Sequence, residues 1–116
     1  MKAIIYHNSK CSKSRATLAL LENQGVESQI IEYLITPPSG DKLKSLAKKL
    51  GLEIKNLVRT GEPEFKRADI DLDTATEEKI LQLLDAHPKL IQRPIVEVAH
   101  GARIGRPPDA VLELFE

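Results

Sequence analysis

The chain has 116 residues, enough for one domain with a single buried core. Its 17 Lys and Arg residues balance 17 Asp and Glu residues, and aromatic residues make up 3%. This composition argues against a general nucleic-acid or membrane-surface binder, and no apolar run approaches the roughly 20 residues of a membrane span. Because one cysteine cannot form an internal disulfide and no signal peptide is recognised, we expect a cytoplasmic protein.

The first third of the chain has the pattern of a β-α-β unit. The sequence predicts a strand over 3–7, a helix over 12–24 and a second strand over 28–33, with Gly25 ending the helix. A crossover this short predicts a right-handed connection between two parallel strands. The residues expected to form the apolar face of the helix are Ala16, Leu18, Ala19, Leu20 and Leu21.

The middle of the chain is expected to be helical. The predicted elements are helices over 41–50 and 77–86, a helical turn near 54–58, and an irregular charged segment over 62–73. Gly51 suits the left-handed position that closes the first helix, and Thr76 is a good N-cap for the second.

The last part of the chain changes to a β pattern. The predicted elements are strands over 95–98 and 102–104, a hairpin turn at His100-Gly101, and a short helix that begins at Pro107-Pro108. The order β-α-β, helical middle, β-β-α is the thioredoxin arrangement. We therefore predict a single α/β domain over 1–116, with a mixed four-stranded sheet and a helical insertion over roughly 39–88.

Cys11 lies between the first predicted strand and the first predicted helix. A side chain at this position faces the N-terminal end of the helix, where unpaired backbone N–H groups and the helix dipole favour negative charge. Lys10, Lys13 and Arg15 add positive charge nearby. Such surroundings lower the pKa of a thiol, so the pattern indicates a nucleophilic cysteine. The alternative is a buried structural cysteine that packs as a small apolar residue.

Three neighbours of Cys11 are candidate catalytic residues. Ser14 stands where a C-x-x-C motif has its second sulfur, so any redox cycle must recruit an outside thiol. His7 could tune the sulfur by charge or hydrogen bonding, or could satisfy a backbone group at the strand end. Arg15, one helical turn after Cys11, could pair with a thiolate or a bound anion, or could be a solvated charge.

Three arginines on predicted loops or strand edges are candidates for binding an oxyanion. Planar guanidinium groups with several donors suit this task, provided that the fold gathers Arg59, Arg93 and Arg106 around Cys11. Pro94 follows Arg93 directly, just before a predicted strand. In the thioredoxin arrangement a proline there is typically cis and faces the cysteine, so we predict a cis bond.

The sequence argues against a phosphatase-type phosphate loop and against a metal site. A tyrosine-phosphatase loop needs C-x5-R, but the position of its arginine is occupied by Thr17, and no glycine-rich phosphate loop is present. No metal site is expected, because His87 and His100 have no ligand spacing.

Several motifs together resemble the glutaredoxin-linked arsenate reductase family (ArsC). The matching stretches are H-N-x-x-C-x-x-S-R at 7–15, Tyr33-Leu34 before Thr36-Pro37-Pro38, the runs over 57–62 and 87–96, and Gly105-Arg106-Pro107. They cover nearly the whole chain, in order and without large gaps.

This resemblance implies a thioredoxin-like fold with a helical insert and a thiol-based reduction of arsenate. In the family, the cysteine matching Cys11 attacks arsenate, glutathione forms a mixed adduct, and glutaredoxin reduces it so that arsenite leaves. Glutathione is thus expected as a co-substrate, with no bound cofactor. The family's oxyanion-binding arginines match Arg59, Arg93 and Arg106, and its thiol-activating histidine matches His7.

Family membership leaves two alternative functions open. One is an ArsC-like thiol oxidoreductase that acts on another substrate. The other is an Spx-type redox-responsive regulator that binds RNA polymerase. Spx-type proteins usually carry C-x-x-C, so Ser14 and the full set of arginines favour the reductase.

Overall fold

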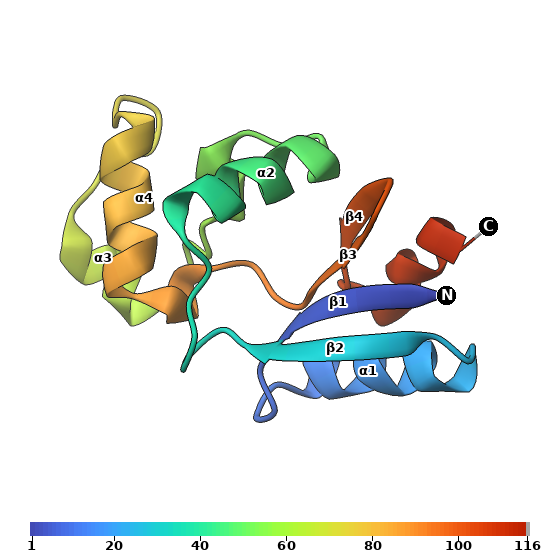
Figure 1. Ribbon diagram of the computed structural model, residues 1–116. Helices are drawn as coiled ribbons and strands as arrows, with labels where there is room; N and C mark the ends of the chain where they lie inside the picture. The colour runs from blue at the N-terminus through green and yellow to red at the C-terminus, as the bar shows by residue number, and fades with distance from the viewer. Residues whose placement is uncertain (116) are drawn as a thin grey trace. The chain divides into compact units, whose positions relative to one another are not determined.

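The structure is a computed structural model that describes residues 1–115, and their contacts form two compact units (Figure 1). The sheet unit comprises Met1–Thr36 and the chain from Arg93 onward, and the helical unit comprises Pro37–Gln92. The helical unit contains the whole range 39–88 that was expected for the insertion. No helix within residues 1–115 is long and apolar enough to cross a bilayer.

The sheet unit is built on four strands within the described residues. They are β1 (Lys2–His7), β2 (Glu27–Glu32), β3 (Ile95–Val98) and β4 (Gly101–Ile104), in the order β2-β1-β3-β4. β1 and β2 are parallel, as the β-α-β pattern predicts, whereas β3 is antiparallel to β1 and β4. The predicted α/β class with a mixed four-stranded sheet is therefore confirmed.

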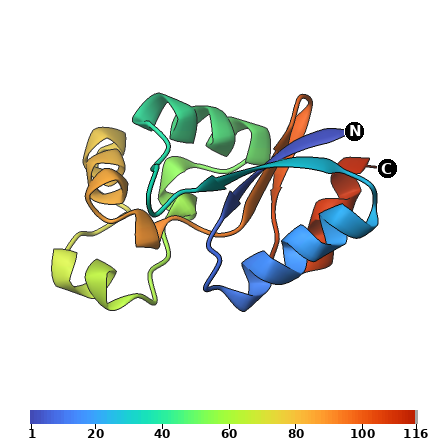
Figure 2. The same ribbon diagram turned by 60° about the horizontal axis from the view of Figure 1, so that its bottom comes forward.

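Two helices lie side by side against the sheet of this unit (Figure 2). They are α1 (Ser12–Asn23) and η3 (Pro108–Phe115), and η3 is a 3-10 helix where the sequence predicted only a short helix. Burying a full aliphatic side chain contributes about 1.5–3 kcal/mol, so the apolar residues of this layer stabilise the unit. The core residues of the layer are Ala3, Ile5, Leu21, Val26, Val96, Val98, Val111 and Leu114.

The buried face of α1 differs from the expected one. It consists of Ser14, Thr17 and Leu21, whereas Ala16 and Ala19 are exposed. The Thr17 hydroxyl donates to the backbone carbonyl one turn earlier at 2.8 Å, so this polar group is satisfied inside the protein. The predicted apolar face was wrong because it was chosen from apolar residues alone. Ser14 and Thr17 are buried because their hydroxyl groups form hydrogen bonds nearby in the chain. Gly25 adopts φ +71° after the helix, as predicted.

The helical unit follows the predicted caps closely. Its elements are α2 (Gly40–Leu50), η1 (Ile54–Leu57), α3 (Pro63–Ala68), α4 (Glu77–Ala86) and η2 (Pro88–Leu90). The Thr76 hydroxyl accepts a hydrogen bond from the Lys79 N–H at 3.2 Å, and Gly51 adopts φ +72°. Both observations confirm the predicted helix ends.

Two predicted details are wrong. The charged segment over 62–73 is not wholly irregular, because α3 forms within it from Pro63 at its first position. This helix buries no residue, so no apolar periodicity marks it. The β3–β4 turn consists of Ala99-His100, since Val98 pairs with Gly101 and Gly101 already belongs to β4.

Gly105 permits a close approach beside β4, so replacing it should destabilise the sheet unit. A Cβ there would overlap the Thr17 hydroxyl and lie 2.8 Å from Pro94 Cγ. We expect Gly105→Ala to lower the free energy of unfolding in urea by about 1–3 kcal/mol. Gly61→Ala is the control, because its Cβ would meet nothing within 4 Å, and it should stay within about 0.5 kcal/mol of wild type. Equal stability of the two variants would contradict this account.

Candidate active site: a thiol at the start of helix α1

Cys11 occupies the N-cap position of α1. Its backbone is extended (φ −94°, ψ 124°), its N–H donates to the Asn8 carbonyl at 3.0 Å, and its carbonyl accepts the Arg15 N–H at 3.0 Å. The Asn8 side chain also accepts the Lys10 N–H at 3.0 Å. These bonds hold the loop between β1 and α1 in a compact turn. They leave the thiol partly exposed at the helix start.

The surroundings of the Cys11 sulfur lower its pKa. Burial opposes ionisation and acts to raise the pKa of the thiol. The backbone N–H of Ser14, the Arg93 guanidinium and the backbone N–H of Lys13 favour the thiolate, and together they outweigh burial. A side chain at the N-cap meets these N–H groups because the first turn of a helix leaves them without backbone partners. The site therefore favours an ionised sulfur.

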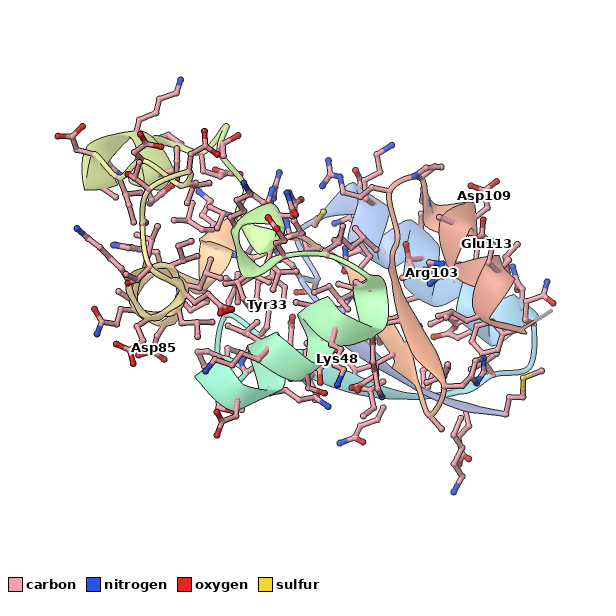
Figure 3. All side chains as sticks on the ribbon, turned by 90° about the horizontal axis from the view of Figure 1, so that it is seen from above. Tyr33, Lys48, Asp85, Arg103, Asp109 and Glu113 are labelled. Atoms are coloured by element: carbon pink, nitrogen blue, oxygen red, sulfur yellow. The ribbon has the colours of Figure 1, made fainter. Side chains whose placement is uncertain are left out.

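Arg93 faces the sulfur from the start of β3. Its guanidinium interacts with both the Cys11 sulfur and the Tyr33 hydroxyl, and these interactions raise the pKa of Arg93 against the opposing effect of burial. The Arg93–Pro94 peptide bond is cis. Tyr33 is 1% exposed and follows β2 directly (Figure 3). The sequence did not single out Tyr33 as a site residue, although its place directly after the second strand of the first β-α-β unit was a usable signal.

His7 contacts Ser14, and the two side chains form a buried pair behind Cys11. Ser14 Oγ lies 2.6 Å from His7 Nδ1 and accepts the Asn8 backbone N–H at 3.0 Å. Burial lowers the pKa of His7, although Glu32 acts in the opposite direction. Because the Ser14 oxygen already accepts a hydrogen bond, its hydroxyl proton suits Nδ1 of a neutral imidazole. His7 thus contacts Ser14, and the backbone N–H of Ser14 in turn interacts with the Cys11 sulfur.

Arg15 and Arg106 have different surroundings. Arg15 Nη1 donates to the Ser9 carbonyl at 2.9 Å. Arg15 thus supports the loop through this bond, and its pairing with a thiolate or a bound anion stays a prediction. Arg106 Nη1 donates to the Arg93 carbonyl at 3.4 Å, which brings the two oxyanion candidates together. The Arg106–Pro107 bond is also cis, which the sequence analysis did not predict.

Arg59 lies in the helical unit, directly after Val58. Its backbone N–H donates to the Leu90 carbonyl at 2.7 Å, and its Nη2 lies 3.4 Å from Glu62 Oε1. Its side chain is 19% exposed, so the guanidinium is held within the unit rather than extended into solvent.

A separate hollow of about 590 Å³ lies within the helical unit. Lys55, on its wall, is ion-paired with Glu53 at 3.5 Å and Asp73 at 3.4 Å. None of the expected site residues lines this hollow. Within residues 1–115, no group of three or more His, Cys, Asp or Glu side chains could hold a metal ion.

Comparisons with known proteins show the family of this chain. A family model described as the ArsC family matches residues 6–114. The chain belongs to the ArsC family. An arsenate reductase of Haemophilus influenzae is 44% identical, covering 99% of this chain and 100% of the relative. An uncharacterised Escherichia coli protein, YfgD, is 44% identical, covering 95% of this chain and 93% of its own length. The solved arsenate reductase from Vibrio cholerae is 48% identical with a TM-score of 0.93, covering 97% of each chain.

In this ArsC-family protein, the sheet unit alone assembles most of the expected site. Cys11 and Arg93 interact directly, and Arg106 reaches the backbone of Arg93. His7 and Ser14 form a buried pair, and the Ser14 backbone N–H favours the ionised sulfur. A partly exposed thiolate beside a guanidinium group is suited to attack an electrophile that carries negative oxygens.

Removing the Ser14 hydroxyl should destabilise the protein. Ser14→Ala leaves the buried Asn8 N–H and His7 Nδ1 without this partner, so we expect unfolding in urea to become easier by about 1–3 kcal/mol. Ser28→Ala is the matched control, because the Ser28 hydroxyl oxygen is buried without a hydrogen-bond partner in the described structure. Its stability should stay within about 0.5 kcal/mol of wild type. Equal losses in both variants would show that the Ser14 bonds are unimportant.

The alkylation rate of Cys11 as a function of pH should show a lowered thiol pKa. We expect its inflection below the ordinary thiol value of about 8.5, and Arg93→Ala should move it upward. Arg103→Ala is the control, because Arg103 pairs with Glu113 at 3.1 Å on the side of η3 (Figure 3). A wild-type inflection at the ordinary value would refute the activated thiolate.

Proposed function

We propose that this ArsC-family protein is an arsenate reductase that uses glutathione and glutaredoxin. The single observation that carries the proposal is the Cys11 thiol, whose pKa is lowered by the start of α1 and by Arg93. The chain is also similar, over nearly its whole length, to proteins named arsenate reductase, and this similarity supports arsenate as the substrate. We place the reaction in the cytoplasm, where glutathione keeps a lone thiol reduced.

In the first proposed step, the Cys11 thiolate attacks the arsenic atom of arsenate. A sulfur–arsenic bond forms, and one oxygen leaves as water after protonation. Arg93 and Arg106, together with Arg59, are proposed to bind the remaining charged oxygens through their guanidinium donors. The arginines stabilise charge that shifts as the oxygen leaves, which is the role that preorganised donors serve best.

The later steps need thiols from outside the chain, because Ser14 cannot act as a resolving sulfur. A glutathione thiol displaces a second oxygen as water and forms a mixed adduct through arsenic. A glutaredoxin thiolate then attacks the glutathione sulfur, and the electron pair of the sulfur–arsenic bond reduces As(V) to As(III). Hydrolysis of the remaining bond releases arsenite and regenerates Cys11. Glutathione is thus a co-substrate, and no bound cofactor is required.

Two alternative functions are distinguished by their requirements. An ArsC-like thiol oxidoreductase would use the same thiolate with glutathione but turn over another substrate. An Spx-type regulator would associate stably with RNA polymerase and would not depend on glutathione. Ser14 argues against the second alternative, since a C-x-x-S motif cannot close an internal disulfide switch.

An NADPH-coupled assay with arsenate, glutathione, glutathione reductase and glutaredoxin tests the proposal. We expect turnover that is lost when glutathione or glutaredoxin is omitted, and abolished by Cys11→Ser. Arg93→Ala should lower kcat about 100-fold, and Arg93→Lys should restore only part of it because lysine lacks the planar fork. Arg103→Ala should retain wild-type activity. Arsenate turnover by Cys11→Ser would rule out the nucleophile assignment, and recovery of RNA polymerase without turnover would favour the regulator.

A further inference from the structure

Glu62 connects Arg59 to a second cation inside the helical unit. Its Oε1 lies 3.4 Å from Arg59 Nη2, and its Oε2 lies 3.7 Å from Lys89 Nζ. The Glu62 side chain is only 17% exposed, so this carboxylate is poorly screened by water. Its two oxygens are thus divided between a candidate oxyanion-binding arginine and a lysine from another segment.

The backbone fixes the same two segments. Besides the short bond from the Arg59 N–H to the Leu90 carbonyl, the Gln92 N–H donates to the Leu57 carbonyl at 2.8 Å, and Val58 forms a β-bridge with Ile91. Arg59 is therefore anchored at its main chain and at one corner of its guanidinium. A long side chain held at both ends loses most of its rotamer freedom before any ligand binds.

A neighbouring carboxylate provides an internal comparison. Glu64 belongs to α3, and its Oε1 pairs with Lys89 at 3.6 Å and with Arg67 at 3.7 Å. Its side chain is 23% exposed, close to the value for Glu62. The two glutamates have similar burial and share Lys89, but the contact with Arg59 is made by Glu62.

We propose that Glu62 is a positioning residue for Arg59 in the proposed arsenate reduction, and this inference rests on that proposed function. Glu62 holds the guanidinium in one orientation, which favours the transition state. Its negative charge also reduces the positive charge that Arg59 and Lys89 present to an oxyanion, which weakens binding of the substrate. Glu62 thus improves orientation at the cost of ground-state affinity.

These two effects predict that kcat and KM fall together when the charge of Glu62 is removed. In Glu62→Gln we expect kcat to fall about tenfold because Arg59 loses its fixed orientation. We expect KM for arsenate to fall about threefold to fivefold, since a carboxylate that opposes the anion is gone. Glu64→Gln should stay within about twofold of wild type in both constants. A purely structural role of Glu62 would not lower kcat and KM together.

A binding measurement separates this inference from the proposed function. In a Cys11→Ser background, arsenate binding followed by NMR titration should become about threefold to fivefold tighter when Glu62→Gln is added. This result can be obtained even if the wild-type protein does not turn over arsenate, an outcome that would refute only the proposed function. Unchanged or weaker arsenate binding in the double variant would overturn the role of Glu62.

If Glu62→Gln fails to fold, Glu62→Asp decides the question. The shorter aspartate keeps the negative charge but cannot bridge Arg59 and Lys89 in the same way. We therefore expect a lowered kcat with an unchanged KM. Wild-type values of both constants in Glu62→Asp would overturn the proposal.

Discussion

The rest of the site depends on the interaction of one sulfur with the start of helix α1 and with Arg93. Burial alone would raise the pKa of Cys11 and keep the thiol neutral. The N–H groups of Ser14 and Lys13 and the guanidinium of Arg93 reverse this balance. The chemistry therefore depends on an N-cap position occupied by a sulfur instead of the usual hydroxyl or carboxylate.

The sheet topology explains why Arg93 reaches a residue more than eighty positions earlier in the chain. β1 and β3 are antiparallel neighbours, and Tyr6 is paired with Ile95. The end of β1, which leads to the Cys11 loop, therefore lies beside the start of β3, which follows Arg93 and Pro94. Because antiparallel neighbours place the end of one strand beside the start of the other, the fold joins the nucleophile and the arginine without any special loop.

Much of this organisation could be predicted from local patterns. The caps at Gly25, Gly51 and Thr76 were correct because each depends on one residue and its own backbone geometry. The β-α-β unit was correct because two short apolar runs separated by a helical pattern are local signals for two parallel strands joined by a helix. Arg93 and Arg106 were candidates from their places on predicted loops and from the resemblance to the ArsC family, but no local pattern could show that they lie close together.

The features that were missed depend on contacts distant in sequence or on polar atoms inside the protein. The buried face of α1 contains Ser14, which a search for apolar spacing passes over. Tyr33 interacts with Arg93, which lies sixty residues later in the chain. Each outcome is set by tertiary partners, so propensity and periodicity carry no information about it.

The most direct test of the central claim is the pH dependence of stability in wild type compared with Cys11→Ser. A thiol whose pKa is lowered by folding stabilises the native state fully above its unfolded pKa of about 8.5, and loses that contribution as pH falls through the folded pKa. The difference in unfolding free energy between the two proteins should therefore increase as pH rises across this window, and then level off. A difference that stays constant or decreases over the same range would contradict the account.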